Sequence, residues 1–186
     1  YADSNVMKEH FNAGLNSLII SIKAGSKDSY KKWTGKDVYS DIFQSITNLF
    51  DYRGGATITI AANIENETTA IINSLVHAKV KFINLHFCSP AIIDGKPNSE
   101  HMMSPGKAAK IMVKTVRYIE KKKIPYNVQI SLPFCLFEPE FIFKLLKQRC
   151  LTSGCIVMKK SGIIIGDKGE VGFCNHMMDF PFGKYG

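Results

Sequence analysis

The chain alternates along most of its length between helix-like segments and short apolar runs, and this alternation restricts it to the α/β class. Apolar runs bounded by turn residues predict four strands, near residues 17–23, 56–64, 80–87 and 126–132. Segments with a helical period lie around them, at residues 6–14, 37–50, 67–77, 104–123 and 138–149. The predicted strands are apolar at consecutive positions, which is typical of burial. We therefore expect right-handed βαβ units and a parallel sheet covered by helices on at least one face.

The length of the chain limits how much of a barrel it can form. A complete (β/α)8 barrel takes about 250 residues, whereas this chain has 186 residues and four predicted strands. We therefore predict a partial (β/α) TIM-like barrel with parallel strands over residues 1–134. The chain opens with Tyr1 and not with Met, so we expect a missing N-terminal half, or an oligomer partner, to cover the strand edge near residues 17–23.

Four of the five cysteines lie at or after residue 135. An isoleucine run at 163–165, a turn at 167–169 and an extended run at 170–174 predict a β-hairpin. Pairing of its strands would bring Cys155 and Cys174 toward the same end, where two thiolates can hold a metal. Residues 135–186 are therefore predicted to be a second, Cys-containing β-hairpin region.

The charge balance and the apolar runs restrict the partners. Twenty-four Lys and Arg against sixteen Asp and Glu give a net charge of +8. The lysines lie on predicted solvated helix faces without interleaved aromatic residues, which argues against nucleic acid as a partner and leaves an acidic partner as the alternative to a solvated surface. No run approaches the roughly 20 apolar residues of a membrane span, and no signal peptide is present, so we expect a cytoplasmic protein without a membrane partner.

Three successive segments resemble the fourth, fifth and sixth barrel strands of radical S-adenosylmethionine (radical SAM) enzymes. They read AGLNSLIISIKAGSKDSYKKWTG, ATITIAANIENE and FINLHFCSP. The closing stretch has Cys155, thirteen residues, Gly169, four residues and Cys174. This spacing is similar to the start of the auxiliary-cluster extension, of SPASM or twitch type, that follows the barrel in part of that family.

The resemblance implies two cofactors, a 4Fe-4S iron–sulfur cluster and S-adenosyl-L-methionine. In the family, a CxxxCxxC loop holds the catalytic cluster, and cleavage of S-adenosylmethionine yields a 5′-deoxyadenosyl radical that takes hydrogen from a substrate. This sequence contains no CxxxCxxC. The chain is therefore expected to be a portion of an enzyme that modifies a peptide or protein, carrying barrel strands and an auxiliary iron–sulfur site.

The resemblance also suggests cofactor-binding residues. Ser21 ends the fourth-strand match and resembles the family serine near the ribose or methionine carboxylate of S-adenosylmethionine. Lys23 stands where an acidic residue is usual, and a cation there would replace an acceptor. Asn63 and Asn66 end the fifth-strand match and are expected to reach adenosine groups, although an asparagine there can equally satisfy loop backbone.

The metal ligands implied by the resemblance are Cys155 and Cys174, with Cys150 and Cys135 as further ligands. Structural zinc also accepts four thiolates, but zinc modules usually contain a CxxC knuckle that this sequence lacks. Iron–sulfur clusters tolerate scattered cysteines. Free thiols without a metal are the remaining alternative.

Two other functional interpretations stay open. A non-catalytic half-barrel could bind a peptide or dock to a partner. His86 and Cys88 end a predicted strand, where barrels present functional residues, although Cys88 can instead be buried filler. A metal-free barrel enzyme would need an acid–base constellation, and the sequence shows none. Asp94, Glu100 and His101 share one loop, and such loop clusters are usually solvated.

Overall fold

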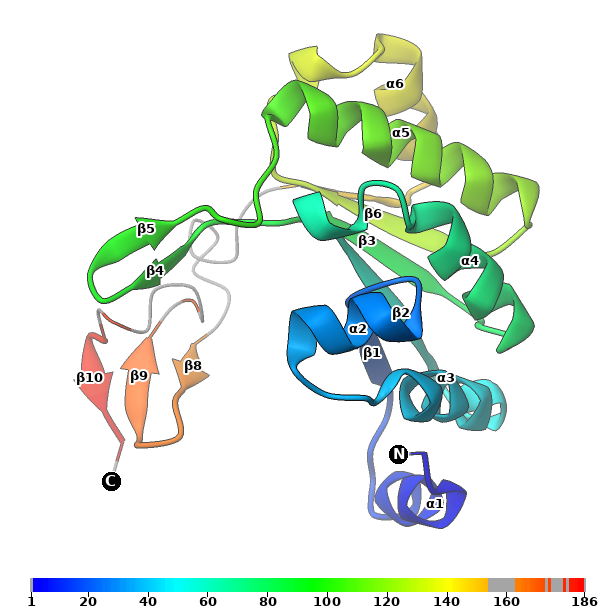
Figure 1. Cartoon of the computed structure of the whole chain (residues 1–186), viewed down its shortest axis with the longest axis vertical. Coiled ribbons are helices and arrows are strands. Elements are labelled where there is room, and N and C mark those ends of the chain that lie inside the picture. Colours follow the sequence, from blue (N-terminus) through cyan, green and yellow to red (C-terminus); the bar gives the residue numbers. More distant parts are fainter. Residues whose placement is uncertain (1, 154–162, 173, 175–178, 180, 186) are drawn as a thin grey trace.

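Five parallel strands form the centre of the molecule, in the order β1-β2-β3-β6-β7 (Figure 1). A computed structural model describes residues 2–153, 163–172, 174, 179 and 181–185. The strands are β1 (Leu18–Ile22), β2 (Gly54–Ile60), β3 (Ile83–Phe87), β6 (Tyr126–Ile130) and β7 (Leu151–Ser153). Every neighbouring pair in this sheet is parallel. The predicted α/β class with a parallel sheet is therefore confirmed.

Helices connect the strands of this sheet. They are α1 (Ser4–Asn12), α2 (Lys27–Thr34), α3 (Tyr39–Asn48), α4 (Thr68–His77), α5 (Pro105–Lys121) and α6 (Pro139–Lys147). Three short 3-10 turns complete the connections: η1 (Leu49–Asp51), η2 (Ala62–Ile64) and η3 (Phe134–Leu136). No helix among the described residues is long and apolar enough to cross a membrane.

One hydrophobic core joins the helices to a single face of the sheet. Every second residue of the central strands is buried, as Ile58 in β2, Leu85 in β3 and Val128 in β6 illustrate. These side chains pack in one cluster with buried residues of α3, α4, α5 and α6. Alternate residues of a strand point to opposite faces, so these four helices lie on the same side of the sheet (Figure 1). Right-handed crossovers between strands in sequential order produce this one-sided arrangement.

The face that α3 to α6 leave uncovered is polar. Its half-buried side chains come from the other set of alternate positions: Ser21, Thr57, Thr59, Asn84, His86, Asn127 and Gln129. The expectation that the strands are apolar at consecutive positions is therefore wrong for β2, β3 and β6. Apolar and polar residues alternate in these strands because only one face meets the helices.

The parallel sheet extends beyond residue 134. α6 packs on the sheet through Phe141, Ile142 and Leu145, and β7 pairs with β6 from Val128 to Ile130. The sheet therefore has one strand more than the sequence predicts. It reaches Ser153, inside the region assigned to the cysteine-containing hairpin.

Two antiparallel elements lie away from the parallel sheet (Figure 1). β4 (Ala91–Ile93) pairs with β5 (Lys96–Asn98) in a hairpin. β8 (Ile164–Ile165), β9 (Glu170–Gly172) and β10 (Gly183–Lys184) form a three-stranded sheet. The turn between β8 and β9 needs Gly169, because its φ is +82° and an added Cβ would approach the Tyr185 carbonyl oxygen to 2.6 Å. The predicted hairpin is therefore present, and β10 extends it.

Candidate ligand-binding site at the carboxyl edge of the sheet

The carboxyl ends of β1, β2 and β3 meet at one edge of the sheet and surround a cavity of about 260 Å³. Parallel α/β proteins bind their ligands at this edge, because the strand-to-helix loops converge there. The cavity is lined by Ile22, Lys23, Trp33, Thr34, Thr59, Ala61, Asn63, Cys88 and His101. It therefore combines an apolar base with polar groups from three different loops.

Hydrogen bonds fix these loops to one another. The Asn63 side-chain amide donates to the Lys23 carbonyl at 2.9 Å, joining the segments that follow β2 and β1. The Ala62 amide donates to the His101 carbonyl at 2.9 Å, and the Cys88 amide donates to the Ile60 carbonyl at 2.9 Å. The walls of the cavity are therefore preorganised, which lowers the entropic cost of binding.

Glu67 fixes the loop between β1 and α2. Its carboxylate accepts hydrogen bonds from the Gly25 amide and from the Ser29 hydroxyl. A Cβ at Gly25 would lie 3.1 Å from both the Cβ and the carbonyl oxygen of Glu67. The loop that follows Lys23 is thus packed tightly against the start of α4.

An aromatic pair forms one wall of the cavity. The indole of Trp33 and the imidazole of His101 meet edge to face, with ring centroids 4.7 Å apart and an interplanar angle of 82°. Trp33 comes from α2, while His101 comes from the segment that follows the β4–β5 hairpin. The pair therefore brings two distant parts of the sequence to the mouth of the cavity.

Polar side chains run from the cavity across the uncovered face of the sheet. Thr59 Oγ1 and His86 Nε2, on paired positions of β2 and β3, lie 2.9 Å apart. One layer deeper, Asn84 donates to Thr57 at 3.3 Å and Asn127 donates to Asn84 at 3.1 Å.

The deeper row ends on β7, where the Thr152 hydroxyl donates to Asn127 at 3.3 Å. This row thus links four neighbouring strands by side-chain hydrogen bonds. A continuous polar row of this kind is suited to contact a polar ligand or chain rather than another apolar layer.

Cys88 lies in the cavity as a protonated thiol at neutral pH. Burial raises its pKa, and the nearby positive charge of Lys23 offsets only part of that rise. A raised pKa lowers the thiolate fraction, and the thiolate is the reactive form. Cys88 therefore fits a lining role better than that of a nucleophile.

The structure separates the residues predicted to contact a cofactor. Ser21 lies on β1, paired with Thr57, on the polar face of the sheet. Asn63 lines the cavity, but its amide is used to bond the Lys23 carbonyl. Asn66 is exposed and does not line the cavity.

The three residues predicted to share one loop, Asp94, Glu100 and His101, are also separated. Asp94 sits in the turn of the β4–β5 hairpin with φ of +51°, and Glu100 is exposed. His101 alone lines the cavity. Sequence reasoning does not identify Thr59 or Trp33 as site residues. The alternation in ATITI is the signal that could have marked Thr59, and the capping residues around 26–35 are the signal that could have placed Trp33 on a helix.

The cysteines predicted as metal ligands lie in different parts of the chain. Cys135 is exposed in η3, after the carboxyl end of β6. Cys150 precedes β7, and because β6 and β7 are parallel, it lies at the opposite edge of the sheet. Cys174 follows β9 and is half-buried, while Cys155 lies outside the described residues.

Cys150 belongs to a polar cluster at the amino edge. Its thiol lies 3.6 Å from the Leu145 carbonyl oxygen and 3.7 Å from Gln148 Oε1. Beside it, the Tyr126 hydroxyl donates to Glu120 at 2.6 Å. Burial, and then the hydrogen bond to Glu120, raise the pKa of Tyr126 above its ordinary value.

The described residues do not by themselves provide a metal centre. No three His, Cys, Asp or Glu side chains in the described part of the chain are grouped to hold a metal ion. Three or four protein ligands are needed to hold zinc or an iron–sulfur cluster. The four-cysteine site therefore stays a prediction, and Cys150 is the member whose position is hardest to reconcile with it.

Comparison with known proteins brings no relative for this arrangement. No family model, no curated protein and no solved structure matches the chain.

Proposed function

We propose that this chain is a portion of a radical SAM enzyme that modifies a peptide or protein, and that its sheet is half of a (β/α) barrel. The sequential all-parallel order β1-β2-β3-β6-β7, with helices α3 to α6 on one face, carries this proposal. A barrel places its helices outside and its remaining strand face inside. The uncovered polar face would thus be the barrel interior.

In this proposal, the cavity at the carboxyl edge binds one part of S-adenosylmethionine. Its volume of about 260 Å³ lies below the range of about 300–1,000 Å³ typical of small-molecule sites, so it would accept the adenosine end only. Thr59 and the Trp33–His101 pair would contact the nucleoside. Lys23 would provide a positive charge at the mouth, which suits a carboxylate.

The cofactor, when bound to a reduced cluster, supplies a radical that takes hydrogen from the substrate. The described residues do not fit such a cluster, so we assign no catalytic step to this chain. Its proposed contribution is to bind the nucleoside, to exclude water from the polar face and to present the substrate there.

A matched pair of variants tests the cofactor claim. Thr59→Val removes a hydroxyl from the cavity, whereas Thr57→Val removes a hydroxyl from the same strand and face one layer deeper. We expect S-adenosylmethionine binding, measured by isothermal titration calorimetry, to weaken about tenfold in Thr59→Val and to change little in Thr57→Val. No binding by the unmodified chain, or equal loss in both variants, would contradict the claim.

Anaerobic reconstitution tests the auxiliary cluster separately. The proposal assigns Cys155 and Cys174 as ligands, with Cys150 and Cys135 as further ligands. We expect bound iron and charge-transfer absorbance in the unmodified chain, loss of both in Cys174→Ser, and retention of both in Cys88→Ser, because Cys88 is outside this set. Colourless protein without iron would contradict the auxiliary cluster. The claim that the cavity binds S-adenosylmethionine would still be decided by the calorimetry.

A second candidate is the non-catalytic, partner-docking half-barrel. The observation in its favour is the edge of β1, which pairs only with β2 in the described structure and exposes 52% of Ile19. An edge strand with an apolar side chain is open to pairing with another chain. If this candidate is right, the chain is dimeric by light scattering, and Ile19→Lys converts it to monomer without binding of S-adenosylmethionine in either form.

A further inference from the structure

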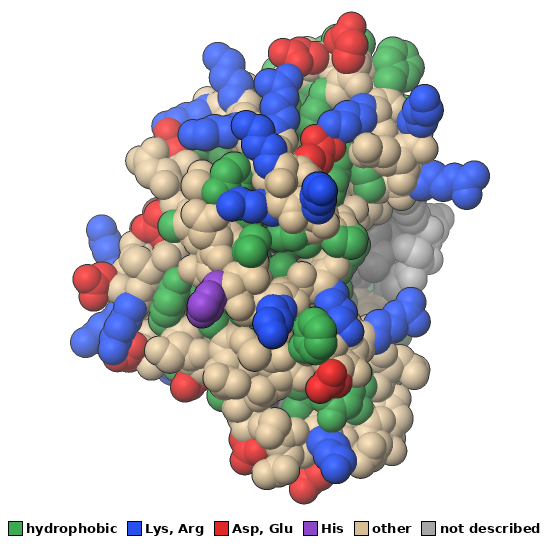
Figure 2. Space-filling view, turned by 90° about the vertical axis from the view of Figure 1, so that its right-hand side faces the viewer, with side chains coloured by type: hydrophobic (Ala, Val, Ile, Leu, Met, Phe, Trp, Pro, Cys, Tyr) green, Lys and Arg blue, Asp and Glu red, His purple; other side chains and the backbone are tan. Residues whose placement is uncertain are grey.

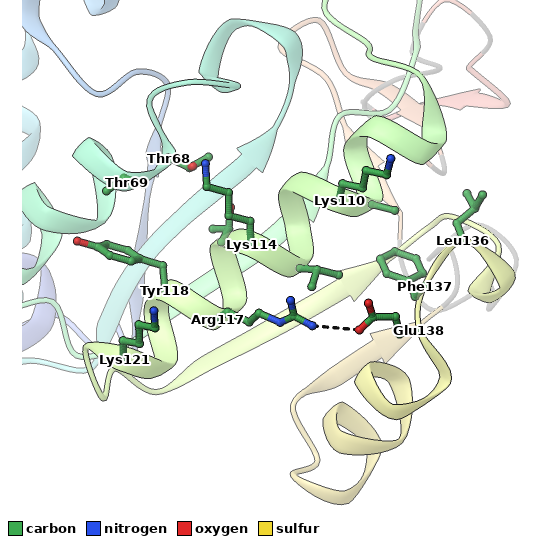
Figure 3. Close-up of a pocket in the computed structure, with 13 residues that line it drawn as sticks. Thr68, Thr69, Lys110, Lys114, Arg117, Tyr118, Lys121, Leu136, Phe137 and Glu138 are labelled. Carbon is green, nitrogen blue, oxygen red and sulfur yellow. Dashed lines mark hydrogen bonds and ion pairs between the residues drawn. The ribbon is translucent and has the colours of Figure 1, made fainter.

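A second and larger cavity lies on the helical side of the molecule and shares no lining residue with the carboxyl-edge cavity. It is a groove of about 600 Å³ between the start of α4, one face of α5 and the η3–α6 junction (Figure 3). Its lining residues are Thr68, Thr69, Ala109, Lys110, Val113, Lys114, Thr115, Arg117, Tyr118, Lys121, Leu136, Phe137 and Glu138. None of these residues belongs to the carboxyl-edge cavity.

Four cations line the groove along α5. Lys110, Lys114, Arg117 and Lys121 follow one another at helical spacing on one face. Arg117 forms an ion pair with Glu138 at 3.0 Å, and the three lysines have no ion pair among the described residues. Figure 2, viewed from the right-hand side of Figure 1, shows several Lys and Arg side chains over the upper part of the molecule, with some Asp and Glu side chains among them. The groove thus carries uncompensated positive charge.

The start of α4 also lines the groove, through Thr68 and Thr69 of its first turn. Its N-cap residue, Glu67, makes no side-chain capping hydrogen bond, and its carboxylate instead accepts hydrogen bonds from Gly25 and Ser29. The amino end of a helix favours negative groups. Figure 3 shows the Lys114 side chain reaching toward Thr68. An anionic group placed between α4 and α5 would meet both.

An unpartnered buried hydroxyl lies among the groove residues. Thr115 is 1% exposed, lines the groove, and its Oγ1 has no hydrogen-bond partner in the described part of the chain. A buried hydroxyl without a partner is costly, and native proteins seldom leave one unsatisfied. Its Oγ1 is itself buried from solvent, so an occupant of the groove would not reach it without a shift of α5. The observations that point to a ligand are therefore the lysines without an ion pair in the described structure and the apolar residues beside them.

The remaining lining residues favour a polypeptide over nucleic acid. Val113, Leu136 and Phe137 provide an apolar strip beside the cations. The Tyr118 ring is already covered by Lys122, at 5.2 Å from its centroid, and its hydroxyl donates to Asn73. Proteins that bind single-stranded nucleic acid use free aromatic faces to stack bases. One face of Tyr118 is thus occupied by Lys122, so the described lining of the groove offers apolar contacts and cations but no pair of free aromatic rings for stacking bases.

The dimensions match a short extended segment. From Lys110 to Lys121 the helix rises about 16 Å, at 1.5 Å per residue. Five residues of extended chain span about the same length, at 3.3 Å per residue. In an extended chain, acidic side chains at alternate positions point to one side and apolar ones to the other. Such a segment would place its carboxylates on the lysines and its apolar residues on Leu136 and Phe137.

We propose that this groove binds an extended acidic peptide segment in which acidic and apolar residues alternate. The site goes beyond the proposed function, because it shares no lining residue with the carboxyl-edge cavity and does not depend on S-adenosylmethionine. Its occupant is a stretch of a substrate or partner protein that docks outside the barrel.

Fluorescence anisotropy on the full chain with a labelled pentapeptide, ELELE with an amidated end, tests the proposal. We expect saturable binding at low salt and roughly tenfold weaker binding by the double variant Lys110→Gln with Lys114→Gln. The matched control is Lys31→Gln with Lys32→Gln, which removes the same charge from exposed positions of α2. It should bind within about twofold of the unmodified chain, because distant exposed charges are screened.

Three outcomes would overturn the proposal. Equal loss in both double variants would mean that only net charge attracts the peptide. Undiminished binding of the neutral peptide QLQLQ would exclude recognition of acidic groups. Tighter binding of a single-stranded oligonucleotide of equal charge, with the same dependence on Lys110 and Lys114, would make the groove a nucleic-acid site. Circular dichroism of each variant confirms that it is folded.

Discussion

The five-stranded parallel sheet and the three-stranded C-terminal sheet are stabilised in different ways. The parallel sheet shares one buried core with four helices, and Leu85 at its centre is 0% exposed. In the sheet of β8, β9 and β10, large apolar side chains face solvent, with Ile165 52% and Tyr185 74% exposed. Main-chain hydrogen bonds, such as those from Phe182 to Val171 and from Tyr185 to Gly169, hold it together.

The difference indicates that the small sheet depends on something besides its own packing. Two or three short strands without a buried face are marginal in water. Small regions of this kind are usually completed by a metal, a disulfide or a partner. The prediction of a metal at Cys155 and Cys174 would meet this need, and so would an apolar partner surface.

The largest effect is expected in the core of the parallel sheet. Leu85→Ala leaves a cavity among β3, its neighbouring strands and the covering helices, and should lower the free energy of unfolding by about 2–5 kcal/mol. Urea unfolding monitored by circular dichroism measures this change. A loss below about 1 kcal/mol would mean that the two regions do not differ as described.

Gly54→Ala should also be strongly destabilising, because β2 begins in close contact with its neighbour. A Cβ at Gly54 would lie 2.1 Å from the Leu18 carbonyl oxygen, which belongs to the backbone and cannot rotate away. We expect a loss of about 2 kcal/mol or more in urea unfolding. The control is Gly106→Ala in the first turn of α5, where nothing lies within 4 Å of the added Cβ. It should be neutral or stabilise by up to about 1 kcal/mol.

A smaller effect is expected in how the free energy of unfolding depends on pH, through a carboxyl group at the amino edge of the parallel sheet. Burial raises the pKa of Glu120, but hydrogen bonds from Lys144 and Tyr126 outweigh burial and leave it below the ordinary value of 4.5. A carboxyl with a lowered pKa in the folded state contributes stability above its unfolded pKa and loses it as the pH falls through the folded value.

The free energy of unfolding of the unmodified chain, measured by urea titration, should therefore fall below pH 4.5 by about 0.5 kcal/mol more than that of Glu120→Gln. Glu140→Gln, at an exposed position of α6 without an ion pair in the described structure, is the control with the same change of charge. If the free energy of unfolding of Glu120→Gln and of the unmodified chain depended on pH in the same way below pH 4.5, the lowered pKa of Glu120 would be contradicted.

The smallest effect is expected in the C-terminal sheet. Ile165→Ser replaces an exposed side chain, so the unfolding of the parallel sheet should change by less than about 0.5 kcal/mol. Hydrogen exchange of the β9 amides should nevertheless be fast in both proteins, because the described residues of this sheet include no buried apolar side chain. Slow exchange at β9 would show that the small sheet is as stable as the large one.

The alternation of elements in the sequence was sufficient to predict the parallel sheet, because each βα unit carries its own apolar runs and turn residues. One-sided coverage agrees with the expectation of helices on at least one face, whereas the expectation of consecutive apolar positions fails for a specific reason. ATITI, INLHF and YNVQI read as apolar runs, yet threonine, asparagine, histidine and glutamine occupy every second position. The alternation that was overlooked also marks Thr59 and His86 as members of the polar face.

Other differences between the sequence prediction and the structure arise from short strands. The Asp94–Gly95 pair is a strong hairpin-turn signal, with both residues at positive φ, but its two strands have only three residues each. β7 is equally short and can be recognised only through its pairing with β6. The cavity depends on contacts between distant residues, such as Trp33 with His101, which no local pattern predicts.

The strand order has a consequence for how the chain folds during synthesis. In the order β1-β2-β3-β6-β7, each new strand pairs with the parallel-sheet strand made immediately before it. No strand must wait for a distant partner, so the separation between paired residues stays modest and each loop closes at low entropic cost. The sheet can therefore grow in one direction as the chain leaves the ribosome.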